Sequence, residues 1–129
     1  MLDKLSDTWR GQLYALFRIL VGLLFLQHGL QKLFGLFGSQ AVPLASMFGV
    51  AGIIELLAGI MLALGILSRW AALVAGVEMI VAYVMVHAPQ GLVPLVNKGE
   101  LALLYLAAFL AVLAFGSGKW SLDQSLGIK

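Results

Sequence analysis

The stretch Leu13–Phe34, LYALFRILVGLLFLQHGLQKLF, decides the fold of this chain. Roughly 20 mostly apolar residues are enough for an α-helix to cross the hydrocarbon core of a bilayer. The apolar residues do not alternate with a period of two, so the stretch predicts a membrane-spanning helix rather than a strand. It nevertheless places His28 and Lys32 one helical turn apart near its end, and ionisable groups at that depth need an explanation.

The overall composition also indicates a membrane protein. The 129 residues are 62% hydrophobic and only 11% charged, whereas a soluble domain carries about 25% charged residues. A chain this poor in charge cannot cover its own surface, so lipid must cover it. The absence of cysteine excludes disulfides and thiolate metal sites within the chain. The basic residues are scattered, which does not indicate a nucleic-acid partner.

Three further apolar runs have a comparable length: about Met47–Leu67, about Trp70–His87 and about Glu100–Phe115. Together with the first stretch they predict an all-α fold, an integral membrane four-helix bundle that forms a single transmembrane domain over residues 1–129. The fourth run is short. The segment 91–95 before it is also apolar, and this loop could dip back into the membrane.

Lysine and arginine near the span ends predict the orientation, because cytoplasmic loops carry an excess of both. One side of the predicted bundle collects Lys4, Arg10, Arg69, Lys119 and Lys129, and the other side has Lys32 and Lys98. Both termini of this multi-pass membrane protein are therefore expected in the cytoplasm. The three tryptophans would all lie at the cytoplasmic interface, where amphipathic rings prefer to sit.

The order of features along the chain allows an internal repeat. The separation from Arg10 to His28 equals that from Arg69 to His87. A duplication would give two parallel helical hairpins that begin on the same side of the membrane. The spacings after each histidine differ, so the alternative is four spans that merely have similar compositions.

All three glutamates, Glu55, Glu78 and Glu100, lie within or at the edge of a span. An ionisable group inside a bilayer is costly, so each is expected to face the bundle interior and to have a partner. At about 1.5 Å per residue, the depth of each polar group can be estimated from its position in its span. These depths predict two polar layers. The outer layer contains His28, Lys32, Glu55, His87 and Glu100, and the inner layer contains Arg18 and Glu78.

Small residues accompany these glutamates at helical spacing, as expected where two helices approach closely in lipid. Glu55 shares a face with Ala58 and Gly59, and Glu78 shares one with Ala71 and Ala75. A similar face is predicted on the fourth run. It consists of Ala107, Ala108, Ala111 and Ala114.

Two interpretations of the outer layer are open. It lines a pocket that binds a polar head group or relays protons, or its members pair only to fix the register of the helices. Arg18 and Glu78 are expected to form a structural ion pair. No metal site is expected, since His28 and His87 lie at unequal depths for a shared haem iron.

Several short motifs together resemble the DoxX family. They are Arg18-x-x-x-Gly22, His28-Gly29-x-x-Lys32-Leu33, Glu55 followed by Gly59 and Gly65, Asn97-x-Gly99-Glu100, and the stretch GSGKWSLD at residues 116–123. The similarity covers essentially the whole chain and implies a small four-helix protein of the inner membrane. The residues that match the family pattern are Arg18, His28, Lys32, Glu55, Glu100 and Asp123.

Members of the DoxX family are linked with quinone-dependent oxidoreduction, so the resemblance implies a component of a quinone- or quinol-linked oxidoreductase. The chain has no flavin, nicotinamide or iron–sulfur motif, so its expected cofactor is at most a bound quinone, with redox centres in a partner subunit. Two alternatives stay open: a small permease for weakly polar aromatic compounds, and a scaffold subunit of a membrane redox complex. A homodimer is compatible with all three.

Overall fold

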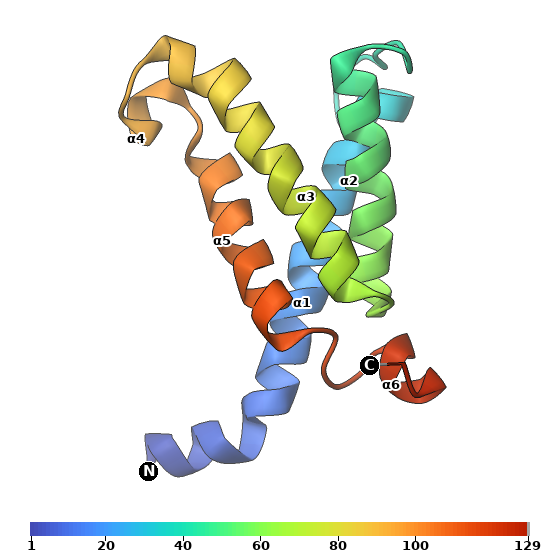
Figure 1. Ribbon diagram of the computed structural model, residues 1–129, viewed down its shortest axis with the longest axis vertical. Helices are drawn as coiled ribbons and strands as arrows, with labels where there is room; N and C mark the ends of the chain where they lie inside the picture. The colour runs from blue at the N-terminus through green and yellow to red at the C-terminus, as the bar shows by residue number, and fades with distance from the viewer. Residues whose placement is uncertain (129) are drawn as a thin grey trace.

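The computed structural model describes residues 1–128 and contains helices and loops but no strand in that range. Four long helices carry the fold (Figure 1): α1 (Leu2–Phe34), α2 (Met47–Leu64), α3 (Ser68–Ala82) and α5 (Glu100–Phe115). Helix α3 continues through a π-helical turn, η1 (Tyr83–His87), and a 3₁₀ turn, η2 (Ala88–Gln90). The short helices α4 (Pro94–Asn97) and α6 (Leu122–Leu126) flank α5.

Three of these segments are long and apolar enough to cross a membrane: α1, α2 and the continuous stretch Ser68–Gln90. Helix α5 is also apolar but shorter. At about 1.5 Å per residue its length is about 24 Å, a little less than the roughly 30 Å of a hydrocarbon core. The predicted all-α membrane bundle is confirmed.

Glycines set the ends of the first two helices. Gly35 ends α1 with φ 67°, and Gly65 ends α2 with φ 70°, the left-handed conformation in which a residue without a Cβ is preferred. The second span therefore stops at Leu64 and does not reach Leu67 as predicted, because the chain turns at Gly65. At the other end of α2, Ser46 Oγ accepts a hydrogen bond from the Gly49 amide at 3.1 Å.

The four long helices form two hairpins. Helix α1 packs most extensively against α2, and α3 against α5, while α2 and α3 join the hairpins. Figure 1 shows the hairpins diverging toward the end that carries the loops 35–46 and 88–99, which we name the loop end. The opposite end, which carries both chain termini and the α2–α3 turn, is named the terminus end.

Backbone contact between α1 and α2 depends on glycine. A Cβ added at Gly22 would lie 2.4 Å from the backbone nitrogen of Ala63, and one added at Gly29 would lie 2.5 Å from that of Leu56. Both distances are far below van der Waals contact. The first hairpin is therefore held by the close approach of small residues on α1 and α2.

Aromatic side chains fill the space between the two hairpins. Phe25 of α1 contacts Tyr105 and Phe109 of α5, with ring centroids 5.1 and 4.9 Å apart. The alanine face predicted on the fourth run is wrong, because Ala107 and Ala114 are exposed. Helix α5 instead buries a stripe at three- and four-residue spacing. Its members are Ala102, Tyr105, Phe109 and Val112.

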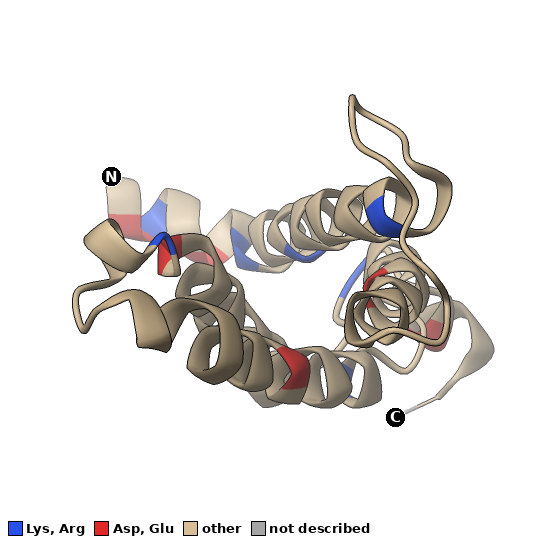
Figure 2. Ribbon diagram, turned by 90° about the horizontal axis from the view of Figure 1, so that it is seen from above, with Lys and Arg blue, Asp and Glu red and all other residues tan. Residues whose placement is uncertain are grey.

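Apolar side chains cover the outside of the bundle. Leucines, valines and isoleucines are exposed along all four long helices, which suits a surface that faces lipid. Figure 2 shows that charged residues occupy few positions along the helices. In the connection before α5, Leu92 is 93% and Leu95 is 77% exposed, so this loop also offers an apolar surface to the membrane.

Candidate ligand-binding cavity

A cavity of about 860 Å³ lies between the two hairpins toward the loop end. Its walls come from α1, α2, α3, η1 and α5. Four of the five residues of the predicted outer layer line it: His28, Lys32, Glu55 and His87. These side chains come from three separate helical segments, so the fold gathers them as the depth argument predicts.

The ionic centre of the cavity is the pair Lys32–Glu55. Lys32 Nζ lies 2.7 Å from both carboxylate oxygens of Glu55. The Glu55 side chain is only 4% exposed and that of Lys32 23%. A Cβ added at Gly52 would lie 3.0 Å from Lys32 Cβ, so the missing side chain at Gly52 lets Lys32 cross α2 to its partner. This pairing explains why α1 carries a lysine at the end of an apolar stretch.

Aromatic rings line the inner part of the cavity. His28, one helical turn before Lys32, packs edge-on against Tyr105, with ring centroids 5.8 Å apart and planes at 87°. Tyr105 also contacts Phe25, and all three side chains line the cavity. The cavity therefore combines aromatic rings with one ion pair and imidazole groups.

His87 is held in place by the loop before α5. Its Nδ1 lies 3.0 Å from the carbonyl oxygen of Asn97. A carbonyl oxygen only accepts, so Nδ1 carries the proton. Asn97 is fully buried, and its side-chain amide donates to Tyr83 Oη at 3.1 Å and to the Gly91 carbonyl at 2.9 Å. Asn97 thus fixes both η1 and the loop, and with them the His87 ring.

Glu100 does not belong to the cavity, which corrects the predicted outer layer. It is exposed at the start of α5 and is not among the lining residues. The buried face of α5 begins at Ala102, and two residues correspond to about 200° of helical rotation. Glu100 therefore lies on the opposite face, although its depth matches that of the other polar groups.

The predicted ion pair between Arg18 and Glu78 is also wrong. Glu78 lies beside Glu55 and lines the cavity, whereas Arg18 reaches the terminus end. The Arg18 guanidinium donates to the carbonyl oxygens of Leu62 at 3.0 Å, Lys119 at 2.9 Å and Trp120 at 2.7 Å, and to that of Ser117. Backbone carbonyl oxygens can accept the hydrogen bonds of an arginine in place of a carboxylate. Because every residue has such an oxygen, the sequence does not reveal which ones will be the partners.

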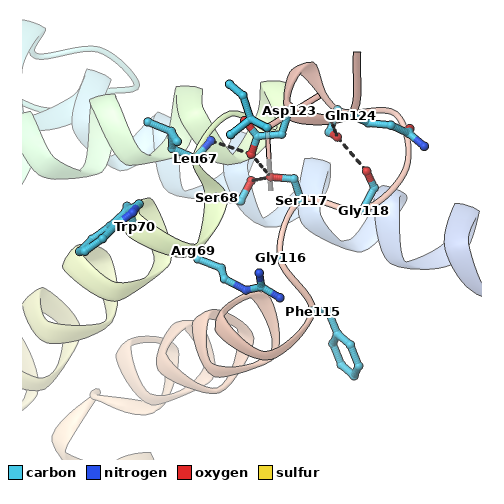
Figure 3. Close-up of a pocket in the computed structure, with 12 residues that line it drawn as sticks. Leu67, Ser68, Arg69, Trp70, Phe115, Gly116, Ser117, Gly118, Asp123 and Gln124 are labelled. Atoms are coloured by element: carbon cyan, nitrogen blue, oxygen red, sulfur yellow. Dashed lines mark hydrogen bonds between the residues drawn. The ribbon is translucent and has the colours of Figure 1, made fainter. Parts of the chain in front are cut away.

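The segment 116–123, here named the C-terminal strap, is fastened across the terminus end by these bonds. Asp123 Oδ2 accepts from the Leu67 amide at 2.8 Å and from Ser117 Oγ at 2.6 Å, and Ser117 Oγ lies 2.7 Å from Ser68 Oγ (Figure 3). These residues also border a second, smaller cavity of about 360 Å³. The dense hydrogen bonding gives the strap, whose sequence contributes to the family resemblance, a structural role.

Sequence reasoning did not assign Tyr105 or Glu78 to the cavity, nor Asn97 to the support of His87. Tyr105 lies in an apolar run, where an aromatic residue facing lipid looks the same as one facing a ligand. Glu78 was assigned to the wrong partner. Asn97 belongs to a motif that contributes to the family resemblance. A polar residue at that place beside an apolar loop could have indicated a role in holding the loop. Within residues 1–128, no three His, Cys, Asp or Glu side chains lie together as a metal site.

The family model described as DoxX matches residues 13–88. The chain belongs to the DoxX family. The matched range contains α1 from residue 13 on, α2, α3 and η1, and therefore His28, Lys32, Glu55 and His87. It ends before α5 and the C-terminal strap.

Two relatives extend the similarity over most of the chain. An uncharacterized protein of Haemophilus influenzae is 37% identical over 125 residues, which cover 92% of this chain and 93% of that protein. An uncharacterized membrane protein of Mycobacterium tuberculosis is 30% identical over 127 residues, which cover 84% of this chain and 78% of that protein. No solved structure matches the chain significantly.

Replacing Lys32 alone should destabilise the protein more than replacing both partners of the ion pair. Lys32→Met leaves the Glu55 carboxylate buried without its cation, and breaking a buried pair in this way costs about 3 kcal/mol. The double variant Lys32→Met/Glu55→Leu removes both charges and should regain most of the loss. Thermal unfolding in one detergent would compare them, with Lys4→Met as the control because Lys4 is exposed. Equal melting temperatures for the two variants would contradict a mutual dependence.

Proposed function

We propose that this DoxX protein is the quinone-binding component of an oxidoreductase in the cell inner membrane, with both termini in the cytoplasm. The observation that carries the proposal is the cavity between the hairpins, in which the Lys32–Glu55 pair adjoins the aromatic surface of Phe25 and Tyr105. Its volume of about 860 Å³ falls in the range of ligand sites, which are mostly apolar with a few polar groups that orient the ligand.

The lining suits a ring that carries oxygen atoms. The ring of a quinone head group can pack against Tyr105 and Phe25, since aromatic rings favour offset or edge-on contact. Lys32 and His28 can donate hydrogen bonds to the ring oxygens. The apolar tail of a membrane quinone would lie between the hairpins, where the cavity wall consists of valine, methionine and leucine side chains.

The titratable groups of the cavity supply the proton chemistry that a quinone requires. Reduction of a quinone to its hydroquinone takes up two electrons and two protons. In the proposed assembly a partner subunit delivers the electrons, because this chain has no sequence motif for a redox centre. His28, Glu55 and Glu78 line the cavity and exchange the protons by general acid–base chemistry.

The proposal predicts that quinones stabilise the purified protein. Ubiquinone and menaquinone analogues should raise its melting temperature, because a ligand that binds only the folded state stabilises that state. Glu55→Gln should abolish the shift, since it removes the charge that holds Lys32 in the cavity. The matched control is Glu100→Gln, a glutamate outside the cavity, which should keep the shift. A melting temperature that no member of the quinone panel changes would refute the proposal.

A small permease for weakly polar aromatic compounds is the second candidate. The observation that favours it is the arrangement of two hairpins that meet at the terminus end and diverge at the loop end (Figure 1), because rocking of two helical units around a midplane site gives alternating access. Uptake of a labelled aromatic compound into proteoliposomes under a proton gradient would favour this candidate over the first.

A further inference from the structure

The second cavity, at the terminus end, contains a buried acceptor without a partner. Asp123 lines this cavity of about 360 Å³ and is only 7% exposed. Its Oδ2 accepts two hydrogen bonds, but Oδ1 is buried and forms none with any other residue of 1–128. Buried side-chain oxygens nearly always have a partner, so an orphaned one at a cavity calls for a specific explanation.

The neighbouring protein donors are committed to other acceptors. The Ser117 hydroxyl donates its single proton to Asp123 Oδ2. The Ser68 hydroxyl, 2.7 Å from Ser117 Oγ, therefore donates to that oxygen. The Arg18 guanidinium donates to backbone carbonyl oxygens and not to Asp123. Asp123 Oδ1 is thus open to a donor that a ligand brings.

The same cavity also contains a cation with an uncommitted donor group. Arg69 lines it and is exposed. Its Nε donates to the Leu113 carbonyl at 3.0 Å and its Nη2 to the Ala114 carbonyl at 3.3 Å, which leaves Nη1 without an acceptor among residues 1–128. Figure 3 shows the Arg69 guanidinium and the Asp123 side chain as separate groups of this cavity. Together they suit a ligand that carries both a cationic donor and an anion.

The cavity lies where the membrane-spanning part of the chain begins. It contains Ser68, the first residue of the membrane-spanning stretch Ser68–Gln90, and Phe115, the last residue of α5. Trp70 also lines it, and Trp70 and Phe115 are both strongly exposed, as expected of amphipathic and aromatic side chains near a membrane surface. Lipid head groups lie at this level, so the position favours a phospholipid as the ligand.

We propose that this cavity binds the head group of phosphatidylethanolamine, whose primary ammonium donates to Asp123 Oδ1 and whose phosphate accepts from Arg69. Charge-assisted hydrogen bonds of both kinds are strong, and a guanidinium matches a phosphate well. Phosphatidylcholine carries the same charges, but its trimethylammonium group has no N–H, so it would leave Oδ1 buried and unpaired. The site is separate from the cavity between the hairpins and does not depend on the proposed function.

Three lipids with identical acyl chains test the head-group preference on the full chain. Delipidated protein in detergent is titrated with dioleoyl phosphatidylethanolamine, phosphatidylcholine or phosphatidylglycerol, and native mass spectrometry measures the bound fraction. Phosphatidylethanolamine should bind at least about tenfold more tightly than either other lipid, the ratio expected for a hydrogen bond to a charged group. Glycerophosphoethanolamine, the same head group without acyl chains, should not displace it at equal concentration.

Two variants separate the two recognition groups. Asp123→Asn keeps an accepting oxygen at Oδ2 and turns Oδ1 into an amide that donates, so the preference for phosphatidylethanolamine over phosphatidylcholine should disappear. Arg69→Gln removes the cation that binds phosphate and should weaken the binding of all three lipids while the preference persists. Asp3→Asn and Arg10→Gln are the matched controls, because both side chains are exposed outside this cavity. Melting temperatures verify that each variant is folded.

Each contrary result bears on one part of the proposal. Equal affinity for phosphatidylethanolamine and phosphatidylcholine in the unchanged protein would overturn it without any variant. A preference that persists in Asp123→Asn would overturn the role of Asp123, and tightest binding of phosphatidylglycerol would indicate a site for anionic lipids instead. Full displacement by glycerophosphoethanolamine would identify a soluble ligand rather than a lipid. None of these results changes the quinone test, which reports on the other cavity.

Discussion

Replacing Arg18 with methionine should destabilise the protein by about 3 kcal/mol or more and release the C-terminal strap. Arg18 is fully buried, and its guanidinium donates to carbonyl oxygens of Leu62 and of three strap residues. Hydrogen bonds to a charged group are worth about 1.5–3 kcal/mol each. Methionine fills a similar space but donates nothing, so the variant loses all of these bonds at once.

Two measurements test this expectation. Thermal unfolding should show the loss of stability, and limited trypsin digestion should cut the variant after Lys119 much faster than the unchanged protein, because the strap no longer lies on the bundle. Arg10→Met is the control, since the Arg10–Asp7 pair is exposed and such surface pairs contribute about 0–1 kcal/mol. An unchanged rate of cleavage in Arg18→Met would mean that Asp123 and Ser117 alone hold the strap.

The second large effect concerns two glycine-to-alanine changes in the middle of helices. Gly29→Ala should cost about 2–3 kcal/mol, because its new Cβ would lie 2.5 Å from the Leu56 nitrogen and 2.8 Å from the Gly52 carbonyl oxygen. Gly76→Ala should be nearly neutral, because a Cβ there would lie 3.7 Å from Leu106 Cδ1, an ordinary contact. The same chemical change is thus costly on α1 and nearly neutral on α3.

Ligand binding provides a second measurement for this matched pair. Gly29 neighbours His28 and precedes Lys32 by one helical turn, so a separation of α1 from α2 moves both side chains away from Glu55. Gly29→Ala should therefore weaken quinone-dependent stabilisation as well as lower the melting temperature, while Gly76→Ala changes neither. A nearly neutral Gly29→Ala would show that α1 and α2 can slide apart at little cost, contrary to the tight backbone contact.

Much of the fold could be predicted because lipid imposes a simple rule on sequence. Long apolar runs must be helical, and the predicted ends Phe34, Met47, Glu100 and Phe115 coincide with helix ends. The predicted end of the second span at Leu67 is wrong because the apolar sequence continues through Gly65. The helix ends there because of the backbone conformation of Gly65, which hydropathy does not reveal. The orientation of the termini remains a prediction from charge counts.

The cavity was only partly predictable because the depth of a residue in the membrane does not say on which face of its helix the side chain lies. Counting residues brought His28, Lys32 and Glu55 to one level, where the cavity lies. The same count put Glu100 at that level too, but the face of α5 on which it lies depends on which stripe packs inward. The predicted carboxylate partner of Arg18 is wrong because its actual acceptors are main-chain oxygens of a segment distant in sequence. Main-chain oxygens cannot be recognised from residue types.

The Lys32–Glu55 pair lies entirely within the first hairpin, and this bears on how the chain enters the membrane during synthesis. Once α1 and α2 have left the ribosome, the ammonium and carboxylate groups neutralise one another, so this pair adds no net charge to the hairpin that partitions into lipid. The Glu78 carboxyl group arrives later on α3 and meets this preformed hairpin. The Arg18 guanidinium of the same hairpin, by contrast, completes its hydrogen bonds only when the C-terminal strap has been made.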